Sequence, residues 1–124
     1  MTAASRLLRH ARECLDLEVL GGELRLRACA LLARQGLESA VAASLRELGV
    51  EGCKLAFRTQ LACLRHLAPP TLRVRRVSYT WVALSHVTHY HGYEMPPTAE
   101  AMENWLTEAE VLVAMLQGAG HAAA

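Results

Sequence analysis

The sequence predicts an all-α fold in which five helices form a bundle. Alanine and leucine dominate a chain of 124 residues that is 52% hydrophobic and holds only two Trp, three Tyr and one Phe. That composition favours helices. Apolar residues recur at intervals of three and four, as on an amphipathic helix, and no stretch reads as a strand. The length fits a single domain.

The first three predicted helices cover residues 2–17, 23–48 and 53–67. Gly21 and Gly22 separate the first two helices, and Gly49 ends the second. The second helix is apolar on most of its sides, which is typical of the central helix of a bundle. Gly36 lies inside it at a cost of about 1 kcal/mol relative to alanine, so we expect a close helix crossing or a local bend there.

The fourth predicted helix runs from Leu72 to Tyr93 and is expected to be central together with the second. Pro69 and Pro70 precede it, and Gly92 is a natural C-cap. Its apolar face is formed by Val74, Val77, Trp81, Leu84 and Thr88. A second stripe of the same spacing runs beside that face and comprises Arg75, Tyr79, Val82, His86, His89 and Tyr93.

The fifth predicted helix covers residues 98–117, with Thr98 as its N-cap and Glu100 in the first turn, where a negative charge favours the helix dipole. Its core stripe consists of Met102, Trp105, Ala109, Leu112 and Leu116. Residues 1–117 are therefore expected to form one helical domain, and residues 118–124 a disordered tail.

Charge is distributed unevenly along the chain. Residues 1–51 hold seven basic and seven acidic side chains, whereas residues 94–124 hold five acids and no Lys or Arg. Residues 52–93 hold no acid and six bases, which are the candidate binding residues: Lys54, Arg58, Arg65, Arg73, Arg75 and Arg76. Either the acidic last helix packs over this basic segment, or a basic surface stays free for a phosphate-bearing partner. We favour the first arrangement, with Glu103 and Glu110 on Arg75 and Arg76.

The histidines allow three interpretations. His86 and His89 share one helix face, where imidazoles can bind a metal or haem if further ligands come from elsewhere. They can also act in proton transfer or RNA contact, which makes the candidate catalytic residues Arg75, Arg76, Tyr79, His86 and His89. We favour a structural role, because histidines near a helix C-terminus interact well with the dipole. No metal site and no cofactor is predicted.

The cysteines and the hydropathy indicate a cytoplasmic protein. No CxxC pair occurs among Cys14, Cys29, Cys53 and Cys63. We expect buried thiols in a reducing compartment, with disulfides as the alternative. No secretory signal segment is visible, and no apolar run approaches the roughly 20 residues of a membrane span. A net charge of +1 shows no overall bias towards nucleic acid or membrane.

Two stretches carry a resemblance to a known family. LLARQGLESAVAASL (residues 31–45) and RRVSYTWVALSHVTHYHGYEMPPTAEAMENWL (residues 75–106) resemble small actinobacterial-type proteins of the HEPN-like helical superfamily. The resemblance implies an up-and-down bundle of four or five helices, frequent dimerisation, and RNA cleavage in toxin–antitoxin or phage-defence systems. The hallmark of the catalytic members, an arginine followed after four to six residues by a histidine, does not occur in this chain.

The missing hallmark favours a non-catalytic role. We expect a HEPN-like binding or assembly module that forms a homodimer and joins a protein or RNA complex, with no membrane association. The first alternative is a metal-independent endoribonuclease in which Arg75 or Arg76 binds phosphate and His86 or His89 moves the proton. Arg75 and His86 are about 16 Å apart along one helix, so that reaction would need a dimer. The second alternative is a histidine-based metal or haem bundle.

Overall fold

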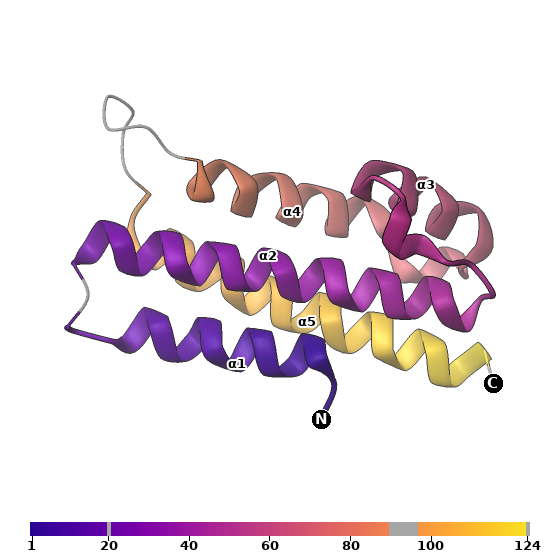
Figure 1. Ribbon diagram of the computed structural model, residues 1–124, viewed down its shortest axis with the longest axis horizontal. Helices are drawn as coiled ribbons and strands as arrows, with labels where there is room; N and C mark the ends of the chain where they lie inside the picture. Colours follow the sequence, from indigo (N-terminus) through magenta and orange to yellow (C-terminus); the bar gives the residue numbers. More distant parts are fainter. Residues whose placement is uncertain (20, 90–96, 124) are drawn as a thin grey trace.

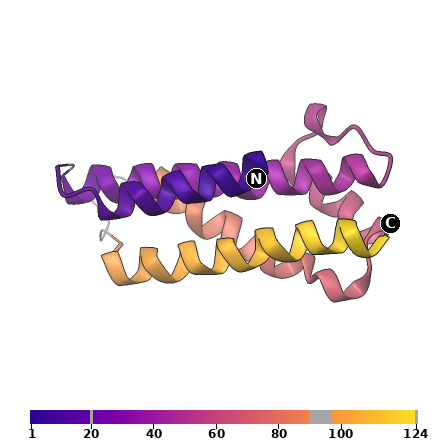
Figure 2. The same ribbon diagram turned by 90° about the horizontal axis from the view of Figure 1, so that it is seen from below.

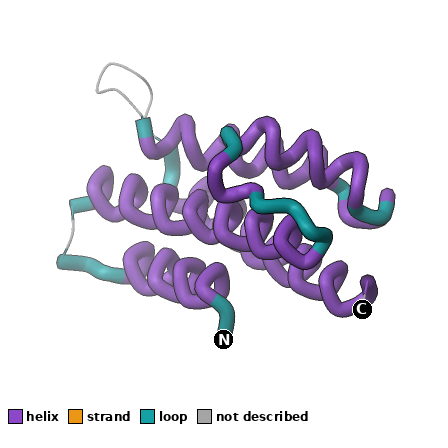
Figure 3. Tube along the Cα trace, turned by 45° about the vertical axis from the view of Figure 1, so that its right-hand side comes forward, coloured by secondary structure: helices purple, strands orange, loops and turns teal. Residues whose placement is uncertain are grey.

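The computed structural model describes residues 1–19, 21–89 and 97–123, and every regular element in these ranges is helical (Figure 3). The long helices run up and down the molecule (Figure 1): α1 (Ala3–Asp16), α2 (Gly22–Glu47), α4 (Val74–Thr88) and α5 (Ala99–Ala123). The short α3 (Phe57–Leu67) lies at one end, against α2 and α4. The predicted all-α bundle of five helices is confirmed.

Helices α1 and α2 form an antiparallel pair with a close crossing. The hydroxyl of Thr2 caps α1 by accepting a hydrogen bond from the Ser5 N–H at 3.1 Å. Farther along the pair, a Cβ atom placed on Gly36 of α2 would lie 3.0 Å from Cδ2 of Leu8 in α1. The glycine therefore allows the two helices to approach closely, which confirms the first of the two explanations that its position suggested.

The predicted third helix is divided into two parts. A 3₁₀ turn, η1 (Gly52–Lys54), comes first, and α3 starts at Phe57. Phe57, Leu61 and Leu64 point into the core as the sequence predicts. The Phe57 ring stacks on Trp81 of α4, with ring centroids 4.8 Å apart and planes inclined by 27°. This aromatic contact joins α3 to α4.

Helix α4 starts later than the sequence predicts. Leu72 belongs to a 3₁₀ turn, η2 (Pro70–Leu72), and Arg73 adopts the left-handed conformation with φ 54° and ψ 57°. A residue in that conformation cannot continue a right-handed helix, so the predicted start at Leu72 is wrong. The predicted end at Tyr93 and the predicted cap Gly92 lie outside the described residues.

Helix α5 begins where the sequence predicts. The hydroxyl of Thr98 accepts a hydrogen bond from the Ala101 N–H at 3.0 Å, which confirms Thr98 as the N-cap. The helix continues to Ala123, beyond the predicted end at Gln117. Alanine, the strongest helix former, is frequent in this segment. No break in the helix marks residue 118, where a disordered tail was expected to start.

The core is centred on α2 and α5. Helix α2 contacts every other α-helix, and α5 contacts α1, α2 and α4. Viewed from below, α1 and α5 run side by side along the molecule (Figure 2). The buried side of α5 is formed by Met102, Leu106, Ala109, Leu112, Val113 and Leu116. Helix α4, which is also expected to be central, contacts α2, α3 and α5 but exposes the stripe that includes Arg75, Tyr79 and His86.

Candidate functional site

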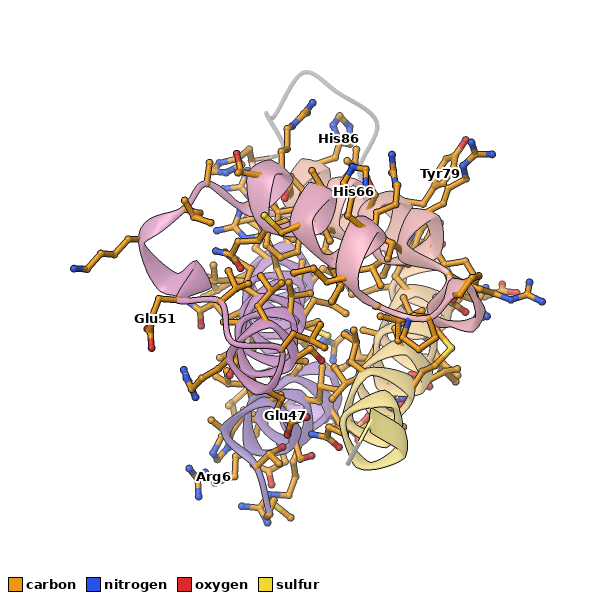
Figure 4. The ribbon with its side chains drawn as sticks, turned by 90° about the vertical axis from the view of Figure 1, so that its right-hand side faces the viewer. Arg6, Glu47, Glu51, His66, Tyr79 and His86 are labelled. Carbon is orange, nitrogen blue, oxygen red and sulfur yellow. The ribbon has the colours of Figure 1, made fainter. Side chains whose placement is uncertain are left out.

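The second stripe of α4 lies on the surface of the protein. Its described members are all exposed: Arg75, Tyr79, Val82, His86 and His89. Tyr79 is 70% exposed, which is unusual for an aromatic side chain in a bundle. In the end-on view, Tyr79 and His86 of α4 and His66 of α3 all project from the same side of the molecule (Figure 4). The sequence predicts the α4 stripe but gives no sign that His66 lies beside it.

Helix α3, which packs against α4, carries further exposed basic side chains. Its buried positions face α2 and α4, and its basic side chains Arg58, Arg65 and His66 are exposed. We define the α3–α4 surface by the exposed side chains Arg58, Arg65, His66, Arg73, Arg75, Tyr79, Val82, His86 and His89. Lys54 is exposed in η1, before α3, and is not part of it. No residue from 52 to 89 is acidic, so α3 and α4 contribute no negative charge to this surface.

The acidic last helix covers little of the basic segment. Arg76 is paired with it, because its Nε and Nη2 donate to Oε1 of Glu108 at 2.8 and 2.5 Å. Within the described part of the chain, no other Lys or Arg of this segment forms an ion pair. The expected cover of Arg75 and Arg76 by Glu103 and Glu110 is therefore wrong.

Glu103 and Glu110 instead bind Arg12 of α1. The Arg12 Nη1 donates to Glu103, and its Nη2 donates to Oε1 of Glu110 at 2.5 Å. The hydrogen bond with Glu110 raises the pKa of the Arg12 guanidinium, the burial of the group opposes that rise, and the bond with Glu103 adds to it. Positions 103 and 110 are two helical turns apart and face α1, whereas position 108 faces α4. The acidic charge of α5 is thus divided between two neighbouring helices.

A groove of about 560 Å³ lies between α4 and α5, next to the α3–α4 surface. Its walls include Arg76 and Tyr79 of α4 and Ala101, Asn104, Trp105 and Glu108 of α5. Tyr79 belongs both to this groove and to the exposed stripe. The sequence places Trp105 in the core stripe of α5, but the structure leaves it half-buried in the groove wall.

The structure brings together an arginine and a histidine that the sequence does not connect. Nη1 of Arg34 in α2 lies 3.4 Å from Nε2 of His89, and the Nε of Arg34 lies 3.6 Å from Oε1 of Glu38. Arg34 and His89 are 55 positions apart in the chain, and only the packing of α2 against α4 places them side by side. By contrast, Arg75 and His86 remain separated by the length of α4, and Arg76 is held towards α5.

Three cysteines are described as free thiols. Cys14 and Cys63 are half-buried free thiols, and Cys29 is a fully buried one. Burial, together with the neighbouring Cys14, raises the pKa of Cys29 to about 12, so its thiol stays protonated at neutral pH. Among the residues that the structure describes, no group of three His, Cys, Asp or Glu side chains is arranged to hold a metal ion.

Comparison with known proteins finds no relative of this chain. No family model, no curated protein and no solved structure matches this chain. Over the described ranges, none of the helices combines the length and the apolar character that crossing a bilayer requires.

Proposed function

We propose that this chain is a non-enzymatic binding module that holds single-stranded RNA on its α3–α4 surface. The observation that carries the proposal is the unbalanced positive charge: six bases and no acid lie between residues 52 and 89, and among them Arg76 alone pairs with a described carboxylate. Basic side chains without acidic neighbours attract phosphates, and an exposed tyrosine offers a base a face to stack on.

The surface suits a single strand better than a duplex. Its arginines and histidines lie along α3 and α4, and Tyr79 stands 70% exposed among them. Non-specific binders of single strands combine a basic track with aromatic stacking platforms. Each phosphate contact releases a counterion, so the affinity should fall steeply as salt rises.

The test is a salt titration of labelled single-stranded RNA against wild type and two matched double variants. Arg65→Glu with Arg75→Glu reverses two charges on the α3–α4 surface. Arg6→Glu with Arg46→Glu reverses two exposed charges elsewhere, and Arg6 projects from the opposite side of the molecule (Figure 4). Both variants have the same net charge and should keep the helical circular dichroism signal.

We expect the first variant to lose at least about tenfold in affinity and to bind with a shallower salt dependence, whereas the second loses about threefold or less. Equal losses in the two variants would mean that only the net charge matters. Wild type that binds no RNA at low salt would refute the proposed function.

The proposal includes the HEPN-like family and a homodimeric assembly. Dimerisation is supported by exposed apolar side chains outside the α3–α4 surface, which include Leu24 on α2, Leu67 at the end of α3 and Val111 on α5. Light scattering should give twice the monomer mass at tens of micromolar protein. A monomer mass under those conditions would remove the dimer from the proposal and leave the RNA surface unaffected.

An endoribonuclease is the second candidate, and one contact favours it. Arg34 Nη1 lies 3.4 Å from His89 Nε2, which places a phosphate-binding group beside a group that can transfer a proton. Incubation of labelled RNA with wild type, His89→Ala and Arg34→Lys tests this candidate. Cleavage that both substitutions abolish would support the nuclease, and uncut RNA with wild type would exclude it.

A further inference from the structure

The groove between α4 and α5 has the size and the walls of a small-molecule site. Its volume of about 560 Å³ lies within the roughly 300–1,000 Å³ typical of ligand pockets. Arg76 and Tyr79 are three positions apart on α4, and Ala101, Asn104 and Glu108 follow the helical period on α5. Each wall is therefore one continuous helix face, and the small side chain of Ala101 leaves room between the two faces.

The chemistry of the walls fits a planar, polar ring. Tyr79 on α4 and Trp105 on α5 supply one aromatic side chain from each side of the groove. Bases are recognised by stacking on such rings and by hydrogen bonds to their edges. The amide of Asn104 carries both donors and acceptors, which is the combination that a base edge requires. The ion pair of Arg76 with Glu108 joins α4 to α5 in the lining of the groove and keeps the guanidinium oriented.

The groove is continuous with the α3–α4 surface. Tyr79 belongs to both, and Arg75 lies one helical turn before Tyr79 on the exposed stripe. A strand whose phosphates follow Arg75 can turn one base past Tyr79 and into the groove. A paired base cannot enter, because its edge and both of its faces are occupied within a duplex.

We propose that the α4–α5 groove is a nucleobase-binding site that holds one unpaired base of the bound RNA strand between Tyr79 and Trp105. The inference rests on the proposed function for the position of the strand. Tyr79 and Trp105 supply the stacking, Asn104 reads the edge of the base, and the cations of the α3–α4 surface hold the adjacent phosphates.

The first experiment observes the groove directly. The chain has two tryptophans, so Trp81→Phe leaves Trp105 as the sole indole, and the new phenylalanine can still stack on Phe57. Adenosine 5′-monophosphate is titrated into this variant, with ribose 5-phosphate as the matched probe that lacks the base. We expect saturable quenching of Trp105 by the nucleotide and none by ribose 5-phosphate.

Three substitutions then separate stacking from charge. Tyr79→Ala should weaken nucleotide and RNA binding by about tenfold, whereas Tyr79→Phe, which keeps the ring, should stay within about twofold of wild type. Ala101→Met fills the groove without changing any charge and should abolish the quenching. None of these residues is fully buried, and circular dichroism checks that each variant folds.

The outcomes distinguish the two proposals. RNA binding that depends on Arg65 and Arg75 but is unchanged in Tyr79→Ala and Ala101→Met would refute the groove and leave the proposed function standing. Base-specific quenching in a protein that binds no RNA strand would refute the proposed function and leave the groove standing. Equal responses to adenosine 5′-monophosphate and ribose 5-phosphate would overturn the base site.

Discussion

The contact between α1 and α2 differs sharply from the contact between α4 and α5. At the first, Leu8 lies directly over Gly36, and the buried residues around them include Ala4, Ala11 and Ala33. At the second, Tyr79 and Trp105 stand at the walls of an open groove. Small side chains bring the first pair of helices together, and large rings fail to fill the space between the second. The comparison indicates that the closely packed α1–α2 side supplies stability, whereas the α4–α5 side keeps an open groove.

We expect the largest effect from a substitution that forces the close α1–α2 crossing apart. Gly36→Val adds a branched side chain where even a Cβ atom would lie 3.0 Å from Leu8. Overpacking of this kind costs typically 1–3 kcal/mol, and we expect a loss of about 3 kcal/mol in the free energy of unfolding. Urea denaturation followed by circular dichroism measures it.

Gly118→Val is the matched control for this substitution. Gly118 is also helical, but no atom lies within 4 Å of the position that its Cβ would occupy. Valine there should be neutral or slightly stabilising, because it forms helix better than glycine does. Similar losses at both glycines would mean that the α1–α2 crossing is not unusually tight.

The second prediction concerns the thiol of Cys29, which is buried on the closely packed α1–α2 side of the bundle. The pKa of Cys29 in α2 is raised from 9.0 to about 12 by burial, so the folded protein keeps a proton that the unfolded chain releases. The contribution of this pKa shift to the free energy of unfolding is therefore fully present below pH 9 and is lost as the pH rises from 9 towards 12. At pH 10 the free energy of unfolding should be lower by about 1.4 kcal/mol than it is well below pH 9.

Comparing wild type with Cys29→Ala at pH 8 and pH 10 isolates this effect. The alanine variant should be less stable at pH 8 because of the cavity, and its unfolding free energy should fall less between the two pH values. Parallel pH dependence in both proteins would show that Cys29 does not titrate differently on folding. Iodoacetamide should also alkylate the half-buried Cys14 and Cys63 before it reaches Cys29.

The smallest expected difference lies between the two arginines that α5 binds. Arg12 holds two carboxylates, of Glu103 and Glu110, whereas Arg76 holds Glu108 alone. All of these groups are partly exposed, so we expect Arg12→Met to cost about 1 kcal/mol and Arg76→Met about 0.5 kcal/mol. Thermal denaturation at low and high salt measures both, and salt should reduce the difference. If Arg76→Met lost more stability than Arg12→Met, the side of the bundle at α4 would be the more stabilising one.

The sequence is sufficient for the existence of the five helices and for the exposed stripe of α4, but not for every helix boundary. Periodicity places all five helices, Thr98 identifies a cap, and Gly36 indicates a close crossing. The exposed stripe from Arg75 to His89 follows from helical spacing alone. These features are local, because each depends on residues within a few turns of one helix.

The features that the sequence misses depend on which helices become neighbours. Position 108 of α5 faces α4 while positions 103 and 110 face α1, and no charge count can reveal that division. The pairing of Arg34 with His89 and the groove at Tyr79 and Trp105 also arise from packing between distant segments. The late start of α4 has a different cause, since helical spacing continues through Arg73 although its backbone is left-handed.

The central position of α2 has a consequence for local opening. Each of the other helices packs against α2, so any one of them can separate from the bundle while the rest remain attached to a common element. We therefore expect amide protons in the middle of α2, from Ala33 to Val41, to exchange only through global unfolding, and those of α3 and α4 to exchange through smaller openings. The protein can therefore rearrange the helices that carry its exposed cations without losing its fold.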